Sequence, residues 1–268
     1  MANQEQLEIL KRGVEVWNKW REEYPNIEID LSRVNFMDVK LRRVNLREAN
    51  LKGANLRRAN LFEANLIGTN LKGADCKRAY LSKADLSKTN LNETNFVQAN
   101  LIDANLTKAS LIKAYLRGAK LNRAELGEAN LKKGCFIAAN FNGANLAQAD
   151  LRGANLKDRK LVNANLINAN CTRTNFIRAN LTSANLNGAN LSDTNLIEAN
   201  LAHANLENAK LVGAKLWKAN LTDANLDDSL LMQLQSASGE ELSPSFHFED
   251  GSLSASMPSI LDKDYYDN

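Results

Sequence analysis

A large apolar residue recurs at every fifth position of the chain from Leu31 to Leu226. This phase runs through 40 five-residue units with no insertion or deletion, and the central residue is Leu in 33 units, Phe in five and Cys in two. The residue two places before the centre is Ala in 29 units, whereas the two residues after the centre vary freely and carry most of the charge. One large and one small apolar residue therefore face inward in each unit, and their neighbours face water.

An inward pair separated by two positions is typical of an extended chain. On a helix, a period of five would spiral the Leu positions around the axis, and on a flat strand an odd period would alternate between the two faces. The chain must therefore turn once per unit. Asn in 26 units and Asp in four precede the centre, and both side chains bond backbone groups at bends. The pattern predicts a solenoid with short sides.

The exceptions to Leu at the centre indicate how many units form one coil. Phe36, Cys76, Phe96, Phe136 and Phe176 are separated by multiples of 20 residues. They share one column if a coil has four units, which gives about ten coils. The remaining exceptions are Phe141 and Cys171, which lie outside that column.

Units such as ANLRR, ANLFE, ANLIG, ADLSK and ANLTS closely resemble the pentapeptide-repeat family. The resemblance covers residues 29–228 and implies an all-β solenoid, namely a right-handed quadrilateral β-helix. The long, Asn-rich array and its lead-in VWNKWREEYPNIEIDLS are also similar to pentapeptide proteins of cyanobacteria. Because members of this family do many different things, the resemblance implies the fold strongly and a function weakly.

The two end segments lack the repeat. In residues 1–28, Leu7, Leu10, Val14 and Trp17 follow helical spacing, which predicts an amphipathic capping helix over the open end of the solenoid. A dimerisation helix or a membrane-surface helix is the alternative. In residues 229–268, we expect a closing cap over 229–235 and then a flexible acidic tail.

Arg159 is the sharp anomaly within the array, because it stands at an inward small position. A buried arginine without a partner would be very costly. We expect a local bulge that turns Arg159 outward. A buried ion pair with Asp158 or Asp150 is the alternative.

Charge is distributed unevenly along the chain. Residues 29–228 contain 29 Lys and Arg against 18 Asp and Glu, whereas both end segments are acidic. Two adjacent sides of the coil carry most of the excess, and we call the side that contains Leu31 side 1 and the side that contains Phe36 side 2. This candidate basic surface consists of Arg33, Lys52, Arg57, Arg58, Lys72, Lys77, Arg78, Lys113, Arg117, Lys132, Lys133, Arg152, Arg173 and Arg178. The two positions after each centre also hold a few acidic residues on these sides. They are Glu93 and Asp193 on side 1 and Asp38, Asp158 and Glu198 on side 2.

Side 2 also carries an apolar column directly after the centre: Ile137, Ile177, Ile197 and Trp217, interrupted by Lys157. Exposed apolar residues of this kind form contact patches. We expect a patch for a protein partner or for a second copy of the chain. Phe246 and Phe248 of the C-terminal tail are a further candidate occupant of this patch.

The sequence offers no candidate catalytic, metal-binding or cofactor-binding residues. It has two His, far from any Cys or second His, and no Ser/His/Asp grouping or phosphate-binding loop. Cys76 and Cys171 are interior centres too far apart to bridge, and Cys135 lies near the surface. With no recognisable signal peptide or spanning segment, we expect a cytoplasmic protein that does not bind membranes.

The sequence therefore favours a non-catalytic scaffold that binds an unidentified protein through the outer sides of a rigid rod. Nucleic-acid binding by the basic surface is the alternative, although no aromatic residues are interleaved in its turn positions. A third hypothesis comes from family members that mimic DNA and modulate DNA gyrase or topoisomerase. The repeat is basic, which disfavours it.

Overall fold

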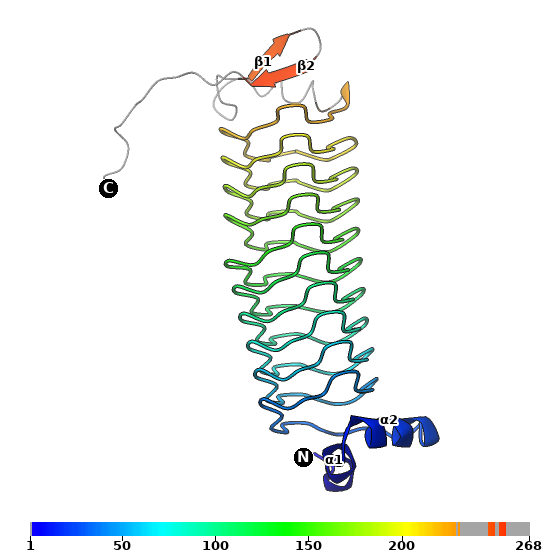
Figure 1. Cartoon of the computed structure of the whole chain (residues 1–268). Helices are drawn as coiled ribbons and strands as arrows, with labels where there is room; N and C mark the ends of the chain where they lie inside the picture. The colour runs from blue at the N-terminus through cyan, green and yellow to red at the C-terminus, as the bar shows by residue number, and fades with distance from the viewer. Residues whose placement is uncertain (1, 229, 231–245, 250–251, 256–268) are drawn as a thin grey trace, which may run out of the picture.

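The main body of the protein is a four-sided rod of stacked coils (Figure 1), seen in a computed structural model that describes residues 2–228, 230, 246–249 and 252–255. Isolated parallel bridges join residues 20 apart, from Asp30 with Asn50 to Asn205 with Asn225. Each coil therefore comprises four five-residue units. Side 3 begins with the unit of Leu41 and side 4 with the unit of Leu46.

Each unit is hydrogen-bonded to the coils above and below it. On side 4, for example, the N–H of Leu46 donates to the carbonyl of Asn65 at 2.8 Å, and the N–H of Asn65 donates to the carbonyl of Val44 at 2.9 Å. The N–H of Glu48 donates to the carbonyl of Ile67 at 2.8 Å. This ladder satisfies most of the backbone of the extended segments. The exceptions among the described residues are the ends of the rod, where a coil has no neighbour, and the contact between residues 133–139 and 152–160, where several of the recurring bonds are absent.

The interior of the rod is filled by the two inward positions of each unit. All central residues except Leu226 and nearly all the small residues are buried, including the Phe column predicted on side 2. Phe136 and Phe141 pack edge to face with ring centroids 5.4 Å apart. Where Thr replaces Ala, its hydroxyl is satisfied: Thr69 donates to the carbonyl of Leu46 at 2.9 Å. The result is an apolar core with its polar groups paired.

The Asn residues before each centre shape the bends, as the sequence predicted. The Oδ1 atom of Asn65 accepts a hydrogen bond from the N–H of Ile67 at 3.2 Å, and the same contact recurs along the array. Many of these side chains also bond the equivalent residue one coil away, such as Asn165 Nδ2 to Asn145 Oδ1 at 3.1 Å. An Asn of this kind therefore fixes a turn within its own coil, and those that bond the next coil also fix the register between the two coils.

In every turn, the second residue after the centre adopts a left-handed backbone conformation. The sequence analysis did not predict this conformation. From Arg33 to Asp223, the second residue after each centre has a φ between 52° and 69°, and most of these residues are not glycine. A positive φ at this position is typical of type II turns. The turn closes with a hydrogen bond such as Ala49 N–H to the Leu46 carbonyl at 3.0 Å.

Gly153 allows a test of this turn geometry. It has a φ of +65° and open space where a Cβ would lie, so Gly153→Ala adds strain without a clash. We expect a loss of about 1 kcal/mol in the free energy of unfolding. Gly127 has an ordinary φ, and the atom nearest to the place of an added Cβ is 3.8 Å away, so Gly127→Ala should be neutral or slightly stabilising. Equal urea midpoints for the two variants would contradict the assigned turn.

The N-terminal segment forms two helices, α1 (Gln4–Lys11) and α2 (Val14–Glu23). The prediction of a single helix was wrong because Gly13 adopts a φ of 122° and a ψ of 159°, which interrupts it. Both helices lie at the N-terminal end of the rod (Figure 1). Leu10 and Trp17 are buried against the core.

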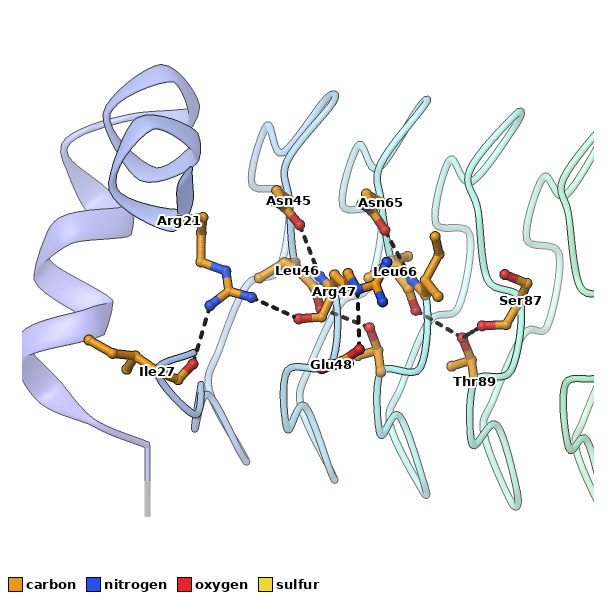
Figure 2. A network of polar contacts seen from close by, with 12 residues as sticks. Arg21, Ile27, Asn45, Leu46, Arg47, Glu48, Asn65, Leu66, Ser87 and Thr89 are labelled. Carbon is orange, nitrogen blue, oxygen red and sulfur yellow. Dashed lines mark hydrogen bonds and ion pairs between the residues drawn. The ribbon is translucent and has the colours of Figure 1, made fainter. Parts of the chain in front are cut away.

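Side chains of α2 bond backbone groups of the first coil that have no preceding coil to pair with. Trp17 Nε1 donates to the carbonyl of Asn45 at 2.7 Å, and Asn18 Oδ1 accepts from the N–H of Asn45 at 2.8 Å. Arg21 donates to the carbonyls of Arg47 at 3.1 Å and Ile27 at 3.2 Å (Figure 2). In later coils the groups corresponding to those of Asn45 and Arg47 bond the preceding coil. The helix therefore replaces the missing ladder partners.

Arg159 is half-buried, and the register around it is unbroken, because Asn140 still pairs with Lys160. The expectation of a bulge was therefore wrong. Its Nε atom donates to the carbonyl of Lys157. Among the described residues, Arg159 forms no ion pair, since Asp158 pairs with Arg178 at 2.7 Å and Asp150 with other cations.

The C-terminal region is described only in part. Leu230 is buried, and its N–H donates to Asp227 Oδ1 at 2.8 Å. An antiparallel pair, β1 (Phe246–Glu249) and β2 (Ser252–Ala255), lies within the segment expected to be a flexible tail. The remainder of the predicted cap (229–235) and tail (236–268) falls outside the described residues.

Candidate interaction surface

Within the described array, a binding site must lie on the outside of the rod, because the inward side chains fill its interior. Within the described ranges, no three His, Cys, Asp or Glu side chains gather where a metal ion could bind. Burial raises the pKa of the thiols of Cys76 and Cys171, in the latter to about 12, so both behave as small apolar core residues. No helix in the described part is long and apolar enough to cross a membrane.

The predicted apolar column on side 2 forms a continuous row near the C-terminal end. Ile177, Ile197 and Trp217 occupy successive coils, because the N–H of Arg178 donates to the Ile197 carbonyl and that of Glu198 to the Trp217 carbonyl, both at 2.9 Å. Trp217 is 39% exposed, with Lys218 Nζ 4.2 Å from its ring centroid. Ile177 and Ile197 are half-buried. These side chains form a partly exposed apolar strip, with Trp217 its most exposed member and Lys218 beside it.

Ile137 stands apart from this strip. It is 50% exposed and lies two coils earlier, because Lys157 occupies the intervening position, as expected. The four residues therefore form one column with two separate apolar parts.

Half of the predicted basic surface is neutralised by ion pairs between neighbouring coils or turns. Arg58 with Asp38 and Arg178 with Asp158 are close pairs in which the guanidinium lowers the pKa of the carboxyl. The other paired cations are Arg57, Lys72, Lys132, Arg152 and Arg173. Arg78 donates to Gln98 Oε1 at 2.8 Å. Exposed pairs of this kind contribute little to stability but reduce the local positive charge.

Seven members of the basic surface form no ion pair among the described residues: Arg33, Lys52, Lys77, Arg78, Lys113, Arg117 and Lys133. They lie on several coils of sides 1 and 2. The positive charge of these sides is therefore discontinuous.

The sequence analysis assigned only the two residues after each centre to the sides of the coil, and it therefore missed two features of this surface. Carboxylates that precede a centre, Asp75 and Asp150, also reach the cations. Two tyrosines at that same position, Tyr80 and Tyr115, are 56% and 53% exposed. The spacing of the repeat could have identified all four, because the residue before the centre lies at an edge between two sides.

Asp150 is the most strongly perturbed carboxyl on side 1. Partial burial raises its pKa, but hydrogen bonds from Arg152 and Lys132 outweigh this effect and hold the pKa at about 2. Arg152 Nε donates to Oδ1 at 2.9 Å, and Lys132 Nζ lies 2.9 Å from Oδ2.

The lowered pKa predicts a pH-dependent contribution to stability. Because the folded pKa lies below the ordinary value of 3.8, the ionised carboxylate stabilises the fold above that value, and this contribution disappears as the pH falls towards about 2. We expect Asp150→Asn to lower the free energy of unfolding by about 1 kcal/mol at pH 7. Near pH 2 the variant and the natural protein should unfold at the same urea concentration. A difference that persists at low pH would show that the effect is not electrostatic.

The sequence matches the family model of pentapeptide repeats in eight copies over residues 29–62, 59–98, 99–136, 136–158, 160–196 and 189–228. This chain belongs to the pentapeptide repeat family. Members of the family form right-handed quadrilateral β-helices and are generally non-catalytic scaffolds.

Solved pentapeptide repeat structures resemble this one. HetL from the cyanobacterium Nostoc sp. strain PCC 7120, a protein involved in heterocyst differentiation regulation, is 33% identical over 79% of this chain and 97% of its own, with a TM-score of 0.46. QnrB1, a plasmid-mediated fluoroquinolone resistance protein, is 18% identical over 77% of this chain and 97% of its own, with a TM-score of 0.43. No curated protein matches this pentapeptide repeat protein significantly.

Proposed function

We propose that this pentapeptide repeat protein is a non-catalytic, cytoplasmic scaffold that binds a protein partner through sides 1 and 2 of a rod of about ten coils. In this proposal α1 and α2 are the end cap. The observation that carries it is the division of each unit into a uniform, buried interior and a variable exterior. The exterior differs much more from coil to coil than the interior, and it alone is accessible to a partner along the array, so specificity is expected to reside there.

The apolar strip of Ile177, Ile197 and Trp217 supports contact with a protein. Aromatic and aliphatic side chains beside a cation, here Lys218, are typical of binding hot spots. The partner is either a second copy of the chain or another protein, and both contacts would bury the strip.

Nucleic-acid binding is less well supported, because ion pairs interrupt the basic surface on both sides. A nucleic-acid site requires a continuous row of free cations along the backbone. Mimicry of DNA is weaker still, since the array has an excess of positive charge.

A pull-down from native extract tests the proposal, with the natural protein as bait at low and moderate salt. We expect a specific protein to be retained at moderate salt. After purification, it should bind the natural protein directly and lose at least 10-fold in affinity for the variant Ile177→Ser/Ile197→Ser/Trp217→Ala.

The matched control changes apolar residues at equivalent positions on sides 3 and 4, namely Ile102→Ser/Val162→Ser/Ile167→Ser, and should bind normally. Light scattering of the pure protein detects the alternative in which the partner is a second copy. Recovery of nucleic acid alone, released by moderate salt, would contradict the proposal.

A further inference from the structure

Two exposed tyrosines mark the opposite edges of side 2. Tyr115 precedes the centre of side 2 and lies at its edge with side 1, between Asn95 and Cys135 of the adjacent coils. Tyr80 lies at the edge with side 3, between Asn60 and Asn100. Both tyrosine residues are more than half exposed, although large aromatic residues are otherwise buried in most of the array.

A groove on the outside of the rod runs along the edge where Tyr80 lies. Its lining consists of Arg78, Tyr80, Gln98, Asn100, Gly118 and Lys120. Gly118 provides the space, because it follows Arg78 and Gln98 in the same column but has no side chain. The hydrogen bond from Arg78 Nε to Gln98 Oε1 holds these two side chains together. The groove therefore combines an aromatic wall, hydrogen-bonding amides and two cations.

The cations around this groove and around Tyr115 are free of carboxylates. Lys113, Arg117, Lys120 and Lys133 form no ion pair in the described part of the chain. Nearby carboxylates are engaged elsewhere: Glu93 lies 3.8 Å from Lys72, and Asp150 binds Lys132 and Arg152. Arginines on other coils of side 2 have partners, as Arg58 does with Asp38. Positive charge is thus uncompensated where the tyrosines are exposed.

We propose that Tyr80, Tyr115, Arg117, Gly118 and Lys120, which we call the tyrosine face, bind an acidic, extended segment of a partner protein. This inference rests on the proposed scaffold function and locates a binding surface within it. Carboxylates of the segment would pair with Arg117 and Lys120. One apolar or aromatic side chain would enter the groove above Gly118 and pack on Tyr80.

The arrangement of the tyrosines favours a peptide over a single-stranded nucleic acid. Tyr80 and Tyr115 lie at opposite edges of one side and two coils apart, ~10 Å along the rod. They therefore cannot stack successive bases on one continuous platform. A peptide uses separate apolar and charged contacts, which the tyrosine face provides.

The test is fluorescence anisotropy with the full-length protein and three labelled probes. The first is the acidic 12-residue peptide (Glu-Phe-Asp-Gly)₃, and the second is oligo(dT) of 12 nucleotides. The third is a peptide with the sequence of residues 238–250 of this chain, which is also acidic. The variants are Arg117→Glu/Lys120→Glu and Tyr80→Ser/Tyr115→Ser, whose side chains are exposed or largely so. The control Lys40→Glu/Lys52→Glu makes the same change of charge at exposed, unpaired lysines in equivalent positions.

We expect the first peptide to bind and to lose at least 10-fold in affinity with Arg117→Glu/Lys120→Glu and at least fivefold with the tyrosine variant. The control should change its affinity no more than twofold. An equal loss of affinity in the control variant would contradict the proposed site. Binding of oligo(dT) as tight as that of the acidic peptide would also contradict it. Tighter binding of the 238–250 peptide would assign the face to the chain's own C-terminal segment.

These outcomes are separable from failure of the proposed function. If the acidic peptide does not bind, while a protein partner from extract binds both tyrosine-face variants normally, the tyrosine face is excluded and the scaffold function stands. If no protein partner exists at all, both proposals fall.

Discussion

Replacing Trp17 with alanine is expected to lower the free energy of unfolding by about 4 kcal/mol. Trp17 is fully buried at the N-terminal end of the core, and its indole N–H is bonded to the Asn45 carbonyl at 2.7 Å. The substitution removes a large buried side chain and leaves the partly buried Asn45 carbonyl without its donor. Because neighbouring coils stabilise one another, the loss should spread into the first coils as fraying.

Conservative variants separate the hydrogen bond from the apolar packing. Trp17→Phe retains an aromatic ring but removes the N–H, so we expect a loss of about 1–2 kcal/mol. Trp20 is half-buried and packs on Trp17 at a ring centroid distance of 5.2 Å, and its indole N–H has no bond among the described atoms. Trp20→Phe should therefore cost much less. Chemical denaturation measures the losses, and equal effects of the two phenylalanine variants would disprove the role of the Trp17 N–H.

Replacing Arg159 with alanine is expected to raise the free energy of unfolding by about 2 kcal/mol. Arg159 occupies an inward position where Ala139 and Ala179 of the adjacent coils are buried. Near Arg159, some of the backbone hydrogen bonds that join neighbouring coils elsewhere in the array are absent among the described residues. Two examples are the bond from the Ala138 N–H to the Lys157 carbonyl and the bond from the Lys160 N–H to the Ala139 carbonyl. Alanine fits the position and would allow these bonds to form.

Hydrogen exchange measures the same effect residue by residue. The amides of Phe136, Ala138 and Lys160 should exchange at least 10-fold more slowly in Arg159→Ala than in the natural protein. Lys157→Ala is the control, because it removes the same charge from the same turn without changing an inward position. An unchanged or lower stability of Arg159→Ala would show that the bond from Arg159 to the Lys157 carbonyl compensates for the opened ladder.

The repeat itself made the fold predictable. Spacing alone indicated inward Leu and Ala positions and bends at Asn, because forty copies of one pattern exclude a helix or a flat strand. The break between α1 and α2 was not predictable in the same way, because Gly13 tolerates a helical conformation as well as the one it adopts. The left-handed turn residues were hidden because charged side chains occupy most of those positions.

The candidate surface was only partly predictable. The apolar column of Ile137, Ile177, Ile197 and Trp217 follows from the period of the repeat. Ion pairing could not be predicted in this way, because it depends on whether the side chains are long enough to meet across two coils. Asp75 and Asp150 illustrate this point, since they stand at edges and neutralise cations of the adjacent turns. The repeat does not predict the identity of the partner, because the residues at the outer positions vary and contain no recognisable binding motif.

Photo-crosslinking in native extract tests the scaffold function most directly. A photoreactive benzoyl-phenylalanine is placed on side 2 at position 117 or 197 and, in the same two coils, on side 4 at position 127 or 207. We expect one and the same protein to be crosslinked from both positions of side 2, with at least fivefold lower yield from side 4. Equal yields from both sides, or crosslinks to nucleic acid alone, would contradict the scaffold function.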